Sequence, residues 1–166
     1  MNKSPRFCVA LLLLLVASSA LGQDVDYQFD DKADFSKFKT YKWLTFKNVA
    51  PIDNLTGEQI KAAVDDALAQ KGLTKIDVDT ADLLIDYQSS ELINEEFPKP
   101  PISPDESPRT IYHGDLAIDM YTPANHHLVW RGVARKTLDP KAKAEKRGKN
   151  LNKAVAKLMR NYPPPK

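Results

Sequence analysis

Two long segments with strand character, joined by a short loop, constrain the fold of this chain more than any other feature. Residues 111–121 and 128–138 alternate apolar and polar side chains, and a turn-rich loop at 122–127 separates them. This pattern is typical of a β-hairpin. If Met120 lies opposite Trp130, large side chains meet small ones on one face, so the sequence predicts this register and a core on that face.

The same register predicts which residues face each other across the hairpin. On the core side these pairs are Ile118 with Gly132 and Leu116 with Ala134, and on the outer side Asp119 with Arg131 and Asp115 with Arg135. We interpret the two outer pairs as ion pairs, because the acid/base pair of a glycosidase needs both carboxylates in one cleft. Exposed ion pairs contribute only about 0–1 kcal/mol each.

The other elements follow from hydrophobic spacing and from helix-ending signals. Strands are expected at 25–30, 40–46 and 81–90, and helices at 56–71 and 141–161. Thr56 and Gln59 form a capping-box pattern, and Gly72 can end the first helix. The sequence therefore predicts an α+β fold, with an antiparallel sheet of about five strands, two helices packed on one face and the order ββαβββα.

The first 22 residues have the pattern of an export signal. Lys3 and Arg6 precede an apolar run at 7–17, and small residues at 20–22 suggest cleavage before Gln23. A membrane anchor is the alternative, but the run is shorter than the roughly 20 residues that span a bilayer. We therefore expect a cleaved signal peptide at 1–22, a single domain at 23–166 and a soluble periplasmic protein.

The single cysteine, Cys8, lies at the front of the apolar run, where it cannot carry the lipid of a bacterial lipoprotein. The predicted mature chain thus has no thiol, no disulfide and no thiolate ligand for a metal. We expect no lipid attachment.

Charge is divided unevenly along the predicted mature chain. Residues 23–130 hold 10 basic and 20 acidic side chains, whereas 131–166 hold 12 basic and 2 acidic ones. On a helical projection, five cations lie opposite the apolar stripe of the last helix: Lys146, Lys149, Lys153, Lys157 and Arg160. This basic stripe is either a solvated surface or a contact for an anionic membrane or polymer. We expect no nucleic-acid partner for an exported protein.

Residues 97–108 contain five prolines, which exclude a helix and remove hydrogen-bond donors that a sheet needs. The segment is either a stiff connection between strands or a protruding element that a partner binds.

Catalytic and metal-binding patterns are weak in this sequence. His113, His126 and His127 lack further convergent ligands nearby. The acidic cluster at 77–82 lacks the glycine and glutamate of a calcium-binding loop. A serine-nucleophile turn and a glycine-rich phosphate loop are also missing, so we expect no cofactor, no metal and no enzymatic activity.

Several short segments together resemble a known family. They are Asp34-Phe35-Ser36-Lys37-Phe38-Lys39-Thr40-Tyr41-Lys42-Trp43, Ala81-Asp82-Leu83-Leu84-Ile85-Asp86-Tyr87, Gly114-Asp115-Leu116-Ala117-Ile118-Asp119, Leu128-Val129-Trp130-Arg131-Gly132 and Tyr162-Pro163-Pro164. Over residues 25–165 the chain resembles the bacterial family catalogued as domain of unknown function 4136. The resemblance implies an α+β envelope protein, often a lipoprotein, without an established activity or catalytic residue.

We therefore expect an exported, non-enzymatic envelope protein that acts as a protein-interaction module with an unknown envelope partner. The first alternative is an electrostatic binder of the anionic envelope surface through the basic stripe. The second is a hydrolase with an unrecognised site.

Overall fold

The computed structural model describes residues 24–44, 54–96 and 107–165. Its elements are β1 (Asp24–Phe29), a 3₁₀ turn (Phe35–Lys37), β2 (Thr40–Trp43), α1 (Asn54–Gln70), β3 (Thr74–Lys75), β4 (Leu83–Glu96), β5 (Arg109–Thr122), β6 (His127–Leu138) and α2 (Ala144–Met159). The expected signal peptide and most of the proline segment lie outside the described residues.

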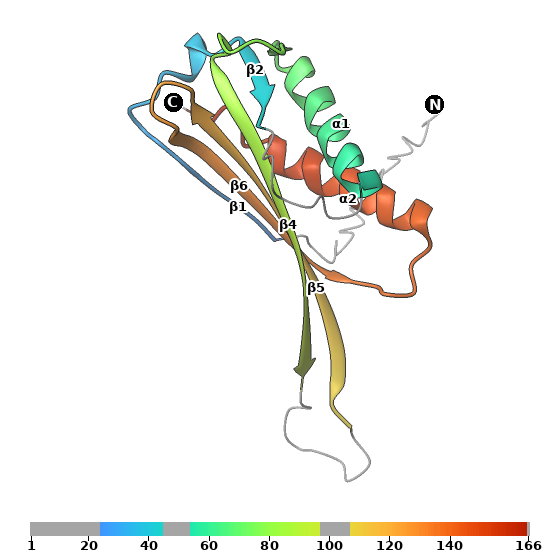
Figure 1. The fold of residues 1–166 in the computed structure, drawn as a ribbon. Helices are drawn as coiled ribbons and strands as arrows, with labels where there is room; N and C mark the ends of the chain where they lie inside the picture. Colours follow the sequence, from blue (N-terminus) through green and yellow to red (C-terminus); the bar gives the residue numbers. More distant parts are fainter. Residues whose placement is uncertain (1–23, 45–53, 97–106, 166) are drawn as a thin grey trace, which may run out of the picture.

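The sheet has six strands in the order β1-β6-β5-β4-β2-β3, and both helices cover one face (Figure 1). The expectation of about five antiparallel strands is corrected in two ways. Strand β2 pairs in parallel with both β3 and β4, because α1 crosses over the sheet between β2 and these strands. Strand β3 has only two residues, which is too short to produce a hydrophobic period in the sequence.

The predicted register of the central hairpin is confirmed. Met120 lies opposite Trp130, Ile118 opposite Gly132 and Leu116 opposite Ala134. Only a very small residue fits at position 132, because a Cβ atom on Gly132 would lie 2.7 Å from Cδ2 of Leu158, which is too close. Glycine therefore leaves the space in which α2 and Trp130 pack against the sheet.

The core lies between the sheet and the two helices. Its buried helical residues include Ile60, Val64 and Leu68 of α1 and Val155, Leu158 and Met159 of α2. Gly72 follows α1 with a positive φ of 81°, a backbone conformation that glycine adopts without strain, so it ends this helix as predicted. Both predicted helices are therefore present, although α2 is shorter than expected.

Polar contacts attach α1 to the sheet. Asp65 accepts hydrogen bonds from the hydroxyl of Tyr41 at 2.7 Å and from Nε1 of Trp43 at 2.8 Å. These bonds satisfy two polar groups at the edge of the core and fix the position of the helix over β2. In the described part of the chain, no helix is long and apolar enough to cross a membrane.

Candidate functional site

The most distinctive surface is an arm, formed by the end of β4 and the start of β5, that projects from the body of the domain (Figure 1). We define the arm as residues 90–96 of β4 and 109–115 of β5, which pair without a break from Ser90 opposite Asp115 to Glu96 opposite Arg109. The sequence predicted that the first strand ends at residue 90 and missed its second half.

One edge of the arm has no neighbouring strand. Strand β2 pairs with β4 only from Leu83 to Ile85, whereas β4 continues to Glu96. On the other side, β6 follows β5 until Leu138 lies opposite Tyr112, so only the outer part of the arm, residues 94–96 and 109–111, has two strands. Within the part of the chain that the structure describes, the outer edge of β4 beyond Ile85 is therefore open.

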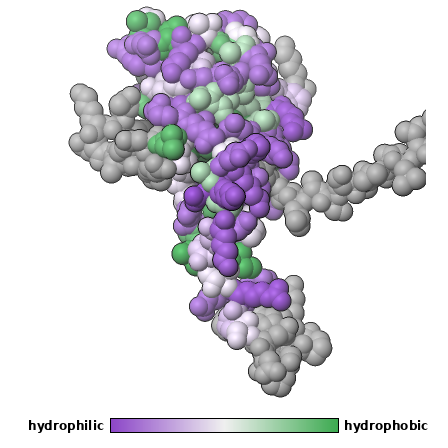
Figure 2. Space-filling model, turned by 90° about the vertical axis from the view of Figure 1, so that its right-hand side faces the viewer, coloured by the Kyte–Doolittle hydropathy of each residue, from purple (hydrophilic) through white to green (hydrophobic). Residues whose placement is uncertain are grey.

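The arm exposes apolar side chains that the sequence analysis did not single out. Leu92 is 53% exposed and Ile93 is 65% exposed, and because they are consecutive in a strand they lie on opposite faces of the arm. Figure 2 shows hydrophobic surface on the arm among hydrophilic residues. A strand that extends beyond its helices has no core of its own, so more than half of each of these side chains is exposed to water.

The β4 half of the arm is acidic. Glu91, Glu95 and Glu96 are exposed, and this half contains no lysine or arginine. Glu96 lies opposite Arg109, whereas Glu91 lies opposite Gly114 and Glu95 opposite Thr110. No ion pair joins any of these three glutamates to another described residue.

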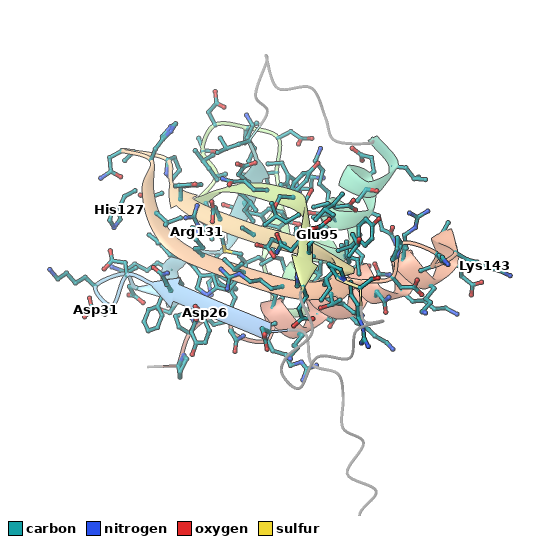
Figure 3. All side chains as sticks on the ribbon, turned by 90° about the horizontal axis from the view of Figure 1, so that it is seen from below. Asp26, Asp31, Glu95, His127, Arg131 and Lys143 are labelled. Carbon is teal, nitrogen blue, oxygen red and sulfur yellow. The ribbon has the colours of Figure 1, made fainter. Side chains whose placement is uncertain are left out.

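A second polar group lies on the sheet face opposite the helices, where Figure 3 labels Arg131. Nε of Arg131 donates to Asp119 at 2.6 Å, its Nη2 donates to the other carboxylate oxygen, and the hydroxyl of Tyr121 also donates to Asp119 at 3.1 Å. The predicted pairing is confirmed, but Asp119 is only 1% exposed. The expectation of an exposed pair is therefore wrong for Asp119, since Arg131 and Tyr121 cover its carboxylate. Asp115 and Arg135 form a looser pair, with 3.7 Å between Nε of Arg135 and the carboxylate.

Asp86 lies directly opposite Asp119 across β4 and β5. Burial raises the pKa of Asp86, and the negative charge of Asp119 raises it further. The hydrogen bond from the backbone N–H of Tyr87 opposes this shift. The raised pKa means that the folded protein holds this proton more tightly than the unfolded chain does.

The sign of this shift predicts how Asp86→Asn changes stability with pH. Wild-type stability should fall as the pH rises from the unfolded pKa of Asp through the raised folded pKa, because the ionised carboxylate is half-buried beside Asp119. Asp86→Asn removes this cost, so at pH 7 it should raise the free energy of unfolding by about 0.2–1 kcal/mol, with little difference below about pH 4. Urea unfolding at both pH values measures the effect, and a less stable variant at pH 7 would refute it.

The basic stripe on α2 is only partly free for binding. Lys146 pairs with Asp139 at 3.1 Å and Lys149 pairs with Glu145 at 2.6 Å. Lys153 and Arg160 are exposed, whereas Lys157 is half-buried. The helix thus presents the predicted cations, but carboxylates of the same region neutralise two of them.

His127 and Asp82 of the acidic cluster have structural contacts. His127, which Figure 3 labels, is the first residue of β6 after the turn. Its Nε2 is 2.8 Å from Oδ2 of Asp30. Asp82 accepts hydrogen bonds from the backbone of Lys39 and from the backbone and hydroxyl of Thr40, and the bond from Lys39 is the main cause of its lowered pKa. Across the described ranges, no group of acidic, histidine or cysteine side chains could hold a metal ion.

A shallow groove of about 400 Å³ runs between the two helices. Its lining mixes alanines with polar and charged side chains, including Asp66, Lys71 and Arg160. The groove contains no aromatic anchor and no buried ionisable group, which are the usual marks of a small-molecule site. The arm is therefore the stronger candidate.

The fold and the surface together define an α+β protein with a helix-covered mixed sheet and a projecting arm. This chain belongs to the family described as Domain of unknown function (DUF4136), whose model matches residues 25–164. The resemblance drawn from the short motifs is confirmed. No curated protein matches the sequence.

Solved structures include similar folds at low sequence identity. A PDZ domain protein from Parabacteroides distasonis is 16% identical with a TM-score of 0.63, over 86% of this chain and 36% of the other, so this chain spans about a third of its length. The PelC dodecamer from Paraburkholderia phytofirmans is 12% identical with a TM-score of 0.49, over 83% and 95% of the two chains. A minor lipoprotein from Acinetobacter baumannii is 9% identical with a TM-score of 0.44, over 75% and 88%. Only the first of these likenesses supports the fold.

Proposed function

We propose that this protein is an exported, non-enzymatic envelope protein that binds a partner protein through its arm. The observation that supports this most directly is the exposure of Leu92 and Ile93 on a strand pair that leaves the body of the domain. Exposed apolar side chains on a protruding element cost solubility and are typical of contact surfaces. The arm also extends toward the proline segment, for which a partner-binding role was one of the two sequence interpretations.

The arm is better suited to this role than the other exposed apolar positions. Five large apolar side chains are exposed among the described residues, namely Phe29, Leu55, Val78, Leu92 and Ile93. Only Leu92 and Ile93 are neighbours in the chain, and only they lie on the arm. The remaining three are isolated positions on the body, which are common on protein surfaces.

Site-specific photo-crosslinking in intact cells of the source bacterium tests this function. A photoreactive residue at position 92 or 93 should give one discrete crosslinked product, because a partner covers the arm. Val78 is a matched control, since it is 57% exposed and lies on the body of the domain. A product obtained equally from position 78, or no product from the arm, would contradict the proposal.

Membrane contact through α2 is the alternative. It predicts instead that the protein sediments with anionic vesicles at low salt and is released at high salt, because exposed charges are screened. Replacing Lys153 and Arg160 with glutamine should then abolish sedimentation. Under the arm proposal, the same double variant keeps the crosslinked product.

A further inference from the structure

We infer that the arm binds its partner by strand addition, and that the added segment is an extended, cationic stretch of another protein lying along the outer edge of β4. This inference rests on the proposed function and names the occupant of the same surface. Three properties of the edge lead to it: the direction of its backbone groups, its charge, and its pattern of side chains.

The direction of the backbone groups follows from the last contact that β2 makes. The N–H of Leu44 donates to the carbonyl of Ile85 at 2.8 Å, so the backbone groups of Ile85 point toward β2, away from β5. In a strand, alternate residues direct their N–H and C=O to the same side. The pairing of β4 with β5 continues without a bulge to Glu96, so this alternation is preserved along the arm.

The residues that follow Ile85 at steps of two therefore present N–H and C=O groups outward, namely Tyr87, Ser89, Glu91, Ile93 and Glu95. No described strand pairs with them on that side. Such a row of unpaired groups is the template that peptides use when they add a strand to a sheet.

The negative charge of the edge indicates which kind of segment binds it. The side chains of Glu91 and Glu95 lie on the same face as Ile93, one before it and one after it. A second copy of the chain, paired antiparallel about Ile93, would place Glu91 opposite Glu95, and like charges directly opposite are destabilising. A segment with the alternating pattern basic–x–apolar–x–basic would instead place a cation opposite each glutamate and an apolar residue opposite Ile93.

Fluorescence anisotropy with two peptides tests the charge requirement. The probe is a labelled peptide with the central sequence Lys-Thr-Val-Thr-Lys and two threonines on each side, so that it reaches Ser89 when its lysines lie opposite Glu91 and Glu95. Its symmetry suits either strand direction, and the control peptide has glutamate in place of lysine. The purified protein should bind the lysine peptide at low salt, whereas the glutamate peptide should bind at least about tenfold more weakly, a difference of about 1.4 kcal/mol. Equal binding of both peptides, or of neither, would overturn the inference.

A matched pair of variants tests the backbone requirement. Ser89→Pro removes an outward N–H without removing a bond to β5, whereas Ser89→Ala removes only the hydroxyl. The proline variant should weaken binding of the lysine peptide about tenfold, and the alanine variant should bind about as tightly as wild type. Equal affinities would show electrostatic contact without strand addition and would overturn the inference.

A charge-neutral variant keeps the test decisive if Ser89→Pro fails to fold. Glu91→Gln combined with Glu95→Gln should reduce binding at low salt and flatten its salt dependence, and unchanged binding would refute the inference. These outcomes are distinct from failure of the proposed function. If position 92 or 93 gives a crosslinked product but the peptide variants behave alike, the arm binds a partner by another mode.

Discussion

Replacing Trp130 with alanine should lower the free energy of unfolding by about 3–5 kcal/mol. Trp130 is fully buried, and its ring packs edge-to-face on that of Tyr162 with the ring centroids 5.6 Å apart. The ring also covers the position where Gly132 has no side chain. Its Nε1 also donates to the backbone carbonyl of Asn161 at 3.3 Å, so the variant leaves a cavity and an unpaired acceptor. Urea unfolding monitored by circular dichroism measures the loss.

Phe29 provides the matched control for this variant. It lies directly opposite Trp130 in the pairing of β1 with β6 but is 41% exposed. Phe29→Ala should therefore cost clearly less, about 1–2 kcal/mol, because part of the side chain already contacts water. Equal losses for the two variants would contradict the position assigned to the core.

Replacing Asp119 with alanine should lower the free energy of unfolding by about 2–4 kcal/mol. The carboxylate is buried and accepts hydrogen bonds from Arg131 and Tyr121. Its removal therefore leaves both donors without their acceptor. We place the loss somewhat below that of a fully buried pair, because the side chain of Arg131 is 37% exposed and water can reach it. Urea unfolding at neutral pH measures the effect.

Asp115→Ala is the internal control for Asp119→Ala. Asp115 lies on the same strand and pairs with Arg135 at 3.7 Å, but its side chain is 32% exposed and that of Arg135 is 56% exposed, so water reaches both partners. Its removal should cost less than about 1 kcal/mol, and added salt should reduce this cost further. If both aspartates contribute equally, burial does not distinguish the two pairs and the interpretation of the sheet face fails.

The hairpin register could be predicted from sequence because it depends on neighbouring side chains. Gly132 and Ala134 leave space for the large residues Ile118 and Leu116 opposite them, and a shift by one residue would turn Ile118 to the solvent face. The first helix could also be predicted from sequence, since its apolar spacing and Gly72 are local signals. These predictions need no knowledge of how distant segments meet.

Other features depend on contacts that no local pattern encodes. The parallel pairing of β2 with β4 follows from the path of α1, and the burial of Asp119 follows from the side chains that surround it. The second half of β4 has glutamates and an asparagine in place of a clear apolar alternation, and its strand conformation comes from pairing with β5. The candidate site was therefore missed at the residues that matter most, Leu92 and Ile93, although the neighbouring proline segment pointed to a protruding element.

Amide hydrogen exchange along β4, measured by NMR with and without the lysine peptide, tests the central claim most directly. In the free protein, the amides of Ser90, Leu92 and Asn94 should already be slowed by their bonds to β5, whereas those of Glu91 and Ile93 should exchange faster. Bound peptide should slow Glu91 and Ile93 selectively and so remove the alternation. If the alternation persists when the peptide is bound, or if protection appears on α2 instead, the open edge of β4 is not the binding surface.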